Sequence, residues 1–390
     1  MSIDMQARLN SVVRNIPPSG IRKFFDIVAE MDDAISLGVG EPDFVTPWHI
    51  RDEGIYSLEK GRTYYTSNSG LKELRTEISN YLDRRFDLKY DPLSQVVVTV
   101  GGSEAIDLFI RSVVEPGDEV LIPDPSFVCY SPITALAGGV PVPVVTKAEN
   151  DFRLTPEDLK AAITPKTKVL VLPFPNNPTG AVMRMEHLKA IAEVLDGTDI
   201  LVLADEIYAE LTYGNERHVS FASISEMYER TVIVSGFSKA YAMTGWRLGY
   251  ACGHPDLIRA MTKVHQFAIM SAPTLAQYAA IEALKNGDKD IAEMKAEYDR
   301  RRNIIVKGFN DMGLECFNPE GAFYAFPCIK STGLNSTAFC EKLLEAKKVA
   351  VVPGNAFGKS GEGFVRCSYA YSVKKINAAL ELIEDFVKHR

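Results

Sequence analysis

Three side chains follow apolar segments in positions from which they could act on an amine. Lys239 follows the run 231–234 on a turn of small residues, Asp205 follows the run 200–204, and Arg247 lies eight residues after Lys239. A lysine amine is a good nucleophile only when its site lowers its pKa, and its best-known use is a Schiff base with an aldehyde cofactor. These residue types match the needs of pyridoxal phosphate: an imine-forming amine, a partner for the ring nitrogen and a phosphate clamp.

A glycine turn is a second candidate for phosphate binding. Gly101-Gly102-Ser103 opens a helix predicted over 103–114, and the N–H groups at a helix N-terminus attract anions. The alternative is an ordinary strand-to-helix turn with a serine cap. Because the segment is not G-x-G-x-x-G, the sequence disfavours a nicotinamide dehydrogenase.

Three further residues could complete a site, and each has an ordinary structural alternative. Tyr208 lies three residues after Asp205, where it could bind a ring oxygen or simply pack in the core. Phe127 could stack on a flat ring or be a core aromatic residue. Arg366 lies in an otherwise apolar predicted strand, and its guanidinium suits a substrate carboxylate as well as a structural ion pair.

Several other motifs can be rejected. Segment 354–360 is one residue short of a P-loop, and Gly236 occupies the serine position of an S-x-x-K motif. No histidine has a convincing triad partner, although His265 lies near the expected site. The six cysteines form no C-x-x-C pair, so the sequence predicts neither a metal site nor a disulfide framework.

Alternating strands and helices must position these residues. Strands are predicted over 96–100, 119–122, 140–145, 169–172, 200–203, 231–235 and 248–251, with helical patterns such as 186–195 between them. This pattern predicts an α/β fold with a mostly parallel sheet covered on both faces. Ligands of such sheets bind at the carboxyl ends of the strands, which is where residues 101–103, 176–180, Asp205 and Lys239 fall.

After about residue 285 the pattern changes to that of a smaller α+β unit. Amphipathic helices over 289–313 and 373–389 flank short strands at 322–326, 349–352 and 364–368. The basic run 300–302 is expected to face solvent. Prolines at 17 and 18 bar a regular helix there and mark residues 1–20 as an N-terminal arm. We therefore expect a small domain from 21–48 plus 286–390 and a large one over 49–285.

Composition narrows the possible classes further. A net charge of −8 and a pI near 5.5 argue against a nucleic-acid partner, which would need a basic face. No apolar run approaches the ~18 residues of a membrane span, and the N-terminus lacks an apolar signal segment. We expect a cytoplasmic protein with reduced cysteines and no membrane partner.

Taken together, these motifs resemble the class I/II aminotransferases of the aspartate aminotransferase superfamily, which have fold type I among the pyridoxal phosphate enzymes. The resemblance runs from about Ile21 to the C-terminus. Its most specific segment is 236–249, around Lys239, and further matches are 37–43, 65–70, 176–180, 205–208 and 321–324. It implies a three-layer large domain that binds pyridoxal phosphate and a smaller α+β domain.

The resemblance also implies a role for each residue around the cofactor ring. Lys239 would form the Schiff base and, once freed by the substrate, would carry the proton between the substrate Cα and the cofactor. Asp205 would pair with the ring nitrogen, Tyr208 and Asn177 would bind the ring oxygen, and Phe127 would stack on the ring.

The implied phosphate site consists of Gly102, Ser103, Ser238 and Arg247. Tyr65 matches a tyrosine that family members donate to the phosphate of the neighbouring subunit. That match implies a homodimer with shared active sites.

The α-carboxylate of the substrate is expected on Arg366, helped by Asn177 and the backbone at Gly40. Two departures from the family pattern could alter affinity or preference. Gly236 stands where many relatives have a phosphate-binding serine, and Phe127 replaces a tryptophan or tyrosine.

The implied reaction is ping-pong transfer of an amino group from an L-amino acid, with aspartate or aromatic donors favoured, to 2-oxoglutarate. Alanine or diaminopimelate-type donors stay open, as does a C–S or β-lyase of the same fold. A non-catalytic regulator would need a further helix-turn-helix domain, for which 390 residues leave no room. Arg22 could bind a side-chain carboxylate of the donor; the alternative is that Arg22 is an ordinary surface arginine. An aromatic pocket could consist of Phe24, Tyr65 and Phe267.

Overall fold

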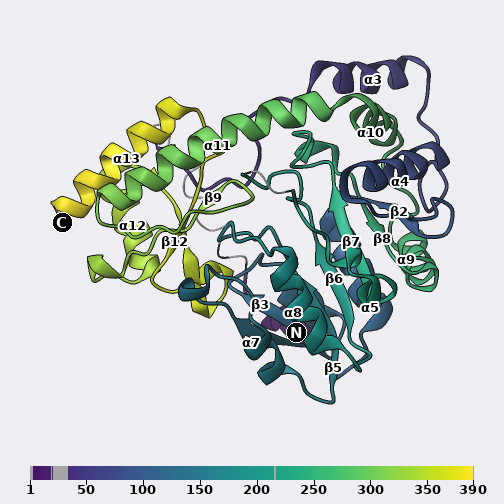
Figure 1. Cartoon of the computed structure of the whole chain (residues 1–390), viewed down its shortest axis with the longest axis horizontal. Coiled ribbons are helices and arrows are strands. Elements are labelled where there is room, and N and C mark those ends of the chain that lie inside the picture. Colours follow the sequence, from purple (N-terminus) through teal and green to yellow (C-terminus); the bar gives the residue numbers. More distant parts are fainter. Residues whose placement is uncertain (1–2, 19, 21–33, 215–216, 390) are drawn as a thin grey trace.

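The computed structural model describes residues 3–18, 20, 34–214 and 217–389. Its centre is a seven-stranded sheet in the order β2-β8-β7-β6-β5-β3-β4. The strands are β2 (Val96–Thr99), β3 (Glu119–Asp124), β4 (Val140–Val145), β5 (Thr167–Leu172), β6 (Leu201–Asp205), β7 (Thr231–Gly236) and β8 (Gly249–Cys252). Neighbours are parallel except that β8 runs antiparallel to β2 and β7. The predicted mostly parallel sheet is confirmed, and Figure 1 shows helices such as α5 (Gly102–Val113), α8 (Met185–Leu195) and α9 (Pro255–Ala268) around it.

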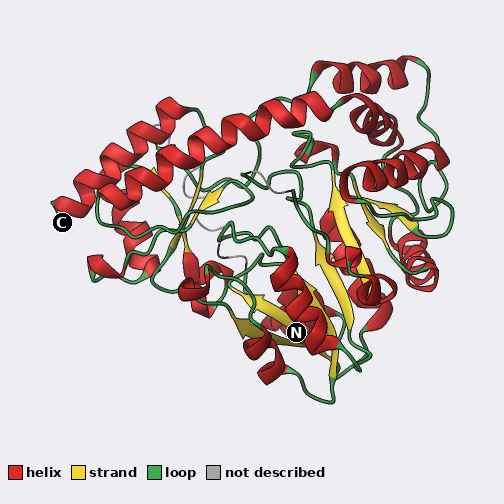
Figure 2. Cartoon of the chain, viewed as in Figure 1, coloured by secondary structure: helices red, strands yellow, loops and turns green. Residues whose placement is uncertain are grey.

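The strands of this sheet are apolar on both faces, and each face has its own layer of helices. In β5, Val169 and Val171 pack toward α5 (Gly102–Val113), α6 (Tyr130–Leu136) and α9 (Pro255–Ala268). Leu170 and Leu172 point the other way, toward α7 (Pro156–Ala162) and α8 (Met185–Leu195). Because side chains alternate across a strand, a run without polar residues requires a cover on each face. Figure 2 shows the resulting arrangement of strands between helices.

The β2–β8 end of the sheet is covered by a third group of helices. They are α3 (Trp48–Glu59), α4 (Lys72–Phe86) and α10 (Thr274–Asn286). Residues Leu74 and Ile78 of α4 and Ala276 and Ala280 of α10 share one buried core with Val98. This core continues to Ile291 at the start of the next helix.

A second unit lies beside the large sheet and contains two small sheets. β1 (Ile35–Ser36) pairs in parallel with β10 (Val349–Ala350), and β12 (Val365–Ser368) lies between β11 (Val352–Pro353) and β9 (Tyr324–Ala325). Helices α11 (Asp288–Asp311), α12 (Ser336–Lys347) and α13 (Val373–Lys388) pack on them through one core. In Figure 1, α11 runs from this unit to α3 and α10. The division of the chain at residues 20, 48 and 286 stays a prediction.

One local expectation was wrong, and the expected end of helical structure at the N-terminal prolines was confirmed. The run 300–302 does not face solvent as a whole, because Arg301 and Arg302 are buried while Arg300 is exposed. Arg301 binds Asp43 at 2.8 Å, so α11 is tied to the segment that follows residue 40. The N-terminal arm does contain a short helix, α1 (Ser11–Asn15), which ends before the prolines.

The rejected P-loop resemblance at 354–360 has a structural explanation. The segment forms two short 3-10 turns, Gly354–Phe357 and Lys359–Gly361, rather than the start of a long helix. Its Ser360 N–H donates to Asp124 at the end of β3 at 3.2 Å. The segment therefore joins the small sheets to the large sheet.

Candidate active site

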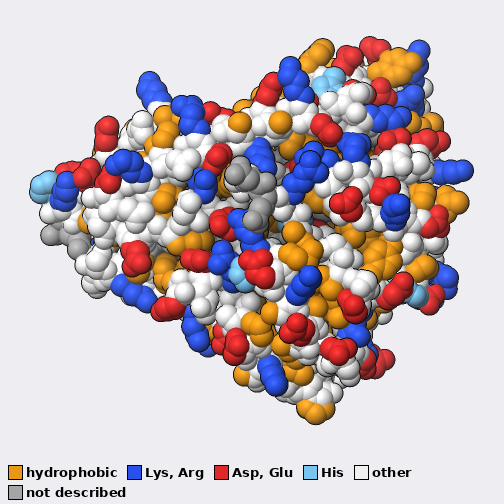
Figure 3. Space-filling view, viewed as in Figure 1, with side chains coloured by type: hydrophobic (Ala, Val, Ile, Leu, Met, Phe, Trp, Pro, Cys, Tyr) orange, Lys and Arg blue, Asp and Glu red, His pale blue; other side chains and the backbone are white. Residues whose placement is uncertain are grey.

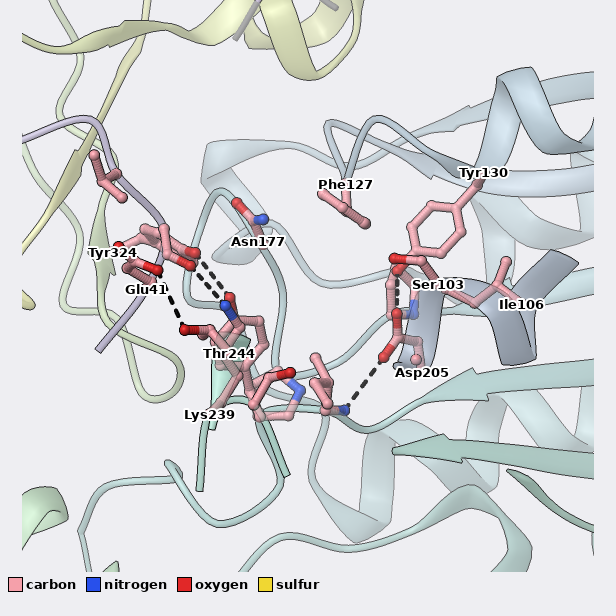
Figure 4. Close-up of a pocket in the computed structure, with 18 of the residues that line it drawn as sticks. Glu41, Ser103, Ile106, Phe127, Tyr130, Asn177, Asp205, Lys239, Thr244 and Tyr324 are labelled. Atoms are coloured by element: carbon pink, nitrogen blue, oxygen red, sulfur yellow. Dashed lines mark hydrogen bonds between the residues drawn. The ribbon is translucent and has the colours of Figure 1, made fainter. Parts of the chain in front are cut away.

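A cavity of about 370 Å³ lies just beyond the carboxyl ends of several strands of the large sheet. Except for Tyr65, the residues expected to bind the cofactor or the substrate α-carboxylate all line it, namely Gly40, Gly102, Ser103, Phe127, Asn177, Asp205, Tyr208, Ser238, Lys239, Arg247 and Arg366. In Figure 4, Tyr324 and Glu41 lie on one side of the cavity and Asp205 and Tyr130 on the other. The sheet topology thus brings together side chains that are up to 326 positions apart, from Gly40 to Arg366.

Lys239 lies on the turn that follows β7, with its amine directed into the cavity. Its Nζ donates a hydrogen bond to the Gly40 carbonyl at 2.6 Å. Burial lowers the pKa of Lys239 to about 8, and the positive charges of Arg366 and Arg247 act in the same direction. A larger fraction of this amine is therefore uncharged near neutral pH than for an exposed lysine, as a nucleophile or a general base requires.

Asp205 ends β6 and is the buried carboxylate of the cavity. Tyr130 donates a hydrogen bond to its Oδ2 at 2.7 Å, and the Ile207 N–H donates to its Oδ1 at 3.2 Å. Burial raises the pKa of Asp205 to about 6, and these two hydrogen bonds oppose that rise. A cationic N–H group placed against this carboxylate would offset its desolvation.

Arg247 lies against the N-terminus of α5. A Cβ atom added at Gly101, the residue that precedes this helix, would lie 2.5 Å from Arg247 Nη2. Gly101 has φ +79°, a conformation that also favours glycine. Within the described residues, no carboxylate lies within ion-pair distance of Arg247. Its Nη1 donates to the Thr244 carbonyl at 3.0 Å. A guanidinium without a carboxylate partner, beside the N–H groups of a first helical turn, is a strong anion site.

Arg366 lies in β12 and is only 2% exposed. Its Nη1 donates to Asn177 Oδ1 at 2.9 Å and its Nη2 to the Gly38 carbonyl at 2.5 Å, but its buried Nε has no partner in the described chain. The described residues also place no carboxylate within ion-pair distance of it. Because a buried charge is costly unless it is paired, the guanidinium is set up to bind a carboxylate of a ligand.

Aromatic side chains form the walls of the cavity between these charges. Phe127 meets Tyr130 edge to face, with 6.0 Å between ring centroids. Tyr208 also lines the cavity, and its hydroxyl oxygen is 2.7 Å from that of Tyr324. The cavity thus offers a Phe127 ring that a flat group could stack on and a Tyr208 hydroxyl that could bind a polar atom at the edge of such a group.

Among the described residues, Tyr65, Phe267 and His265 do not line the cavity. Tyr65 is 79% exposed and Phe267 is 83% exposed, and both lie on the outer surface. Arg22 and Phe24 lie outside the described residues. His265 is fully buried and pairs with Glu104 at 2.8 Å, so it is a core histidine rather than a cavity residue.

Sequence reasoning missed four polar residues that line the cavity, namely Glu41, Tyr130, Thr244 and Tyr324. Tyr130 contacts Asp205, and Tyr324 contacts Tyr208. Thr244 donates a hydrogen bond to Glu41 at 3.2 Å. Tyr324 lies in a motif that the sequence singled out, but without a role. Nothing in the spacing of Tyr130 distinguished it from a core tyrosine. In the part of the chain that the structure describes, no group of His, Cys, Asp and Glu could hold a metal ion.

Comparison with known proteins agrees with this arrangement. The family model described as "Aminotransferase class I and II" matches residues 32–383. The chain is 55% identical to the protein named "Putative aminotransferase YugH" of Bacillus subtilis strain 168, over 98% of this chain and 99% of that protein. It is 45% identical to the aspartate aminotransferase of Pyrococcus abyssi, over 96% and 97% of the two chains. The crystal structure of an aromatic aminotransferase from Pyrococcus horikoshii superposes with a TM-score of 0.90 at 44% identity, covering 95% of this chain and 99% of that one.

Proposed function

The chain belongs to the class I and II aminotransferase family, and from this premise we propose that it uses pyridoxal phosphate to move the amino group of an L-amino acid to 2-oxoglutarate. Fold type I and a transaminase activity follow from its relatives over nearly the whole chain. The cofactor, the donor and the assembly are the parts that we propose.

The residues of the cavity fit pyridoxal phosphate. Arg247, Gly102, Ser103 and Ser238 would hold the phosphate, because they combine a guanidinium that has no carboxylate partner among the described residues with a helix N-terminus. The buried Asp205 would hold a protonated ring nitrogen.

The faces and the edge of the ring have partners as well. Phe127 would stack on one face, and Tyr208 with Asn177 would hydrogen-bond the ring oxygen. Lys239 would hold the aldehyde carbon covalently. Bound pyridoxal phosphate supplies a ring that accepts electron density from the substrate Cα.

The protein's own groups then control the proton. Arg366 binds the substrate carboxylate and so fixes the orientation of the Cα–H bond. Once the substrate amine has displaced it from the aldehyde carbon, Lys239 would carry this proton between the substrate Cα and the cofactor, because its lowered pKa suits both the removal and the return of a proton. Asp205 keeps a proton on the ring nitrogen as long as the aspartate is ionised.

One observation carries this proposal: an amine with a lowered pKa and a buried, unpaired guanidinium share one cavity with a buried carboxylate. The test is to load the protein with pyridoxal phosphate and add an amino donor alone. We expect the absorption of bound cofactor to change to that of its amine form, with release of one equivalent of oxo acid. Accumulation of pyruvate and ammonia over many turnovers would instead identify a lyase. The Lys239→Ala variant should show neither reaction.

The proposed donors are aspartate and aromatic amino acids. Relatives named for both substrates match over nearly the whole chain, and the cavity wall carries apolar as well as charged groups. A panel of amino acids with 2-oxoglutarate as acceptor tests this preference. Turnover of alanine or a diaminopimelate-type donor, with neither aspartate nor any aromatic amino acid accepted, would contradict it.

We also propose a homodimer in which Tyr65 of each subunit serves the phosphate of the other. Its exposure of 79% leaves the Tyr65 side chain free to reach a second molecule.

The proposed location is the cytoplasm, which is supported by the six cysteines, all of which are free thiols. Across the described residues, no helix has both the length and the apolar character that a membrane crossing needs.

A further inference from the structure

Tyr324 contacts more of the active site than any role assigned above explains. It lies in β9, which pairs with β12, and its side chain is 1% exposed and lines the cavity. Its ring and its hydroxyl group touch different partners, so the two parts of the side chain can be considered separately.

The ring of Tyr324 forms one face of the Arg366 site. The Arg366 Cζ atom lies 4.5 Å from the centre of this ring and 4.7 Å from the centre of the Phe357 ring. An aromatic face attracts a guanidinium and restricts its plane. The guanidinium also donates to Asn177 and to the Gly38 carbonyl, so the two rings add to these hydrogen bonds in fixing its plane.

The hydroxyl group of Tyr324 lies between Tyr208 and the loop at Gly40. It is 2.7 Å from the Tyr208 hydroxyl oxygen, and a Cβ atom added at Gly40 would lie only 2.6 Å from it. A phenol has a single hydrogen to donate. When Tyr208 donates its hydrogen to a ligand, its oxygen is free to accept the hydrogen of Tyr324.

We infer that Tyr324 is a positioning residue with two separable actions, which rest on the proposed function. Its ring holds the Arg366 guanidinium in the plane that receives the substrate carboxylate. Its hydroxyl group donates to Tyr208 and strengthens Tyr208 as a hydrogen-bond donor to the cofactor oxygen. One tyrosine therefore adjusts both substrate binding and the electronic state of the cofactor.

Two substitutions separate these actions. Tyr324→Phe keeps the ring and removes the hydroxyl group, whereas Tyr324→Leu removes both. Tyr369→Phe is the matched control, because Tyr369 is a fully buried tyrosine of the same core whose hydroxyl group bonds the Ala322 carbonyl and does not line the cavity. Circular dichroism and the melting temperature show whether each variant is folded.

The first measurement is a pH titration of the absorption of bound pyridoxal phosphate. Loss of a donor to Tyr208 weakens the stabilisation of the anionic ring oxygen, so Tyr324→Phe should raise the midpoint by ~0.5 to 1 pH unit. The second is calorimetric binding of succinate, a carboxylate without an amine. Tyr324→Leu should weaken it about fivefold or more, and Tyr324→Phe less than about twofold.

The inference fails if Tyr324→Phe leaves the midpoint unchanged, if it weakens succinate as much as Tyr324→Leu does, or if Tyr369→Phe has the same effects. Failure of the proposed function would look different. In that case the wild type would not bind pyridoxal phosphate, while succinate binding to the protein without cofactor would still test the action of the ring. If Tyr324→Leu does not fold, the comparison of Tyr324→Phe with Tyr369→Phe decides the hydroxyl action.

Discussion

At the scale of single residues, the cavity combines charges that would be unstable without a ligand. Lys239, Arg247 and Arg366 supply three positive charges, and Asp205 and Glu41 supply two negative ones. The places of these charges decide the properties of the cavity more than their net value does, because the buried Asp205 and Arg366 lack oppositely charged partners in the described chain. Burial disfavours the charged form of Asp205 and raises its pKa to about 6, so the effect of a ligand on this carboxylate should depend on pH.

The first prediction concerns the amine of Lys239. Its pKa of about 8 lies below the usual lysine value, so the uncharged amine dominates above pH 8. The rate at which the cofactor-free protein takes up pyridoxal phosphate should rise with pH, with a midpoint near pH 8, when followed by absorbance. Arg366→Met should move the midpoint upward, because the charge of Arg366 helps to lower this pKa. Arg259→Met, at an exposed surface position, is the control. A midpoint near that of an ordinary lysine would contradict the argument.

The second prediction concerns Tyr130, whose hydrogen bond opposes the rise in the pKa of Asp205. In Tyr130→Phe this pKa should rise above about 6, so Asp205 becomes neutral at higher pH and loses its hold on a cationic ring. We expect affinity for pyridoxal phosphate to fall about five- to tenfold at pH 6 and less at pH 8. The control is Tyr250→Phe, a buried tyrosine of β8 outside the cavity. An equal loss at both pH values would show that Tyr130 acts only through packing.

At the scale of elements, the start of α5 and the turn after β7 form the anion site together. Neither element is sufficient, because the helix supplies N–H groups and the turn supplies Arg247. Arg247 has φ +53°, an uncommon conformation for a residue with a side chain. The turn therefore directs the guanidinium toward α5.

The third prediction tests the contact between these two elements. Gly101→Ala would place a methyl group 2.5 Å from Arg247 Nη2 and should displace the guanidinium. Affinity for pyridoxal phosphate should fall by about tenfold or more, whereas affinity for pyridoxal, which has no phosphate, should change less than about twofold. Gly117→Ala is the matched control, since Gly117 also has a positive φ of +95° but has open space around it. Equal losses for both ligands would place the effect in folding rather than in phosphate binding.

At the scale of the whole molecule, one group of exposed apolar side chains includes Tyr65. Tyr64, Tyr65, Phe267, Ile269 and Met270 are all more than 40% exposed, and Asn68 ties their segments together by donating to the Met270 carbonyl. A monomer rarely exposes so many large apolar side chains together. Figure 3 shows hydrophobic side chains at the surface over α3 as well, among charges of both signs.

The fourth prediction is that the protein sediments at twice its chain mass of 43.1 kDa. Phe267→Glu should promote dissociation, because it places a charge in the proposed contact, and should weaken pyridoxal phosphate binding through loss of Tyr65. Leu136→Glu, at an exposed apolar position at the end of α6, should do neither. Sedimentation of the unmodified protein as a monomer would contradict the shared-site proposal.

The sequence by itself determined the α/β order and most of the cavity. Strands, helices and their polar end residues are local features, since alternation, apolar runs and glycine turns are written in consecutive residues. The rule that ligands bind at the carboxyl ends of parallel strands then placed Asp205, Lys239 and the 101–103 turn together.

The tertiary structure alone decided how these residues are connected. Tyr130 and Tyr324 have no distinctive spacing, and their importance comes from partners 75 and 116 positions away. Likewise, Arg301 and Arg302 became buried because acceptors from other segments meet α11, which a local pattern of charges does not record. Burial and hydrogen bonding between distant segments depend on packing in three dimensions, so they set the pKa values and the unpaired charges of the site.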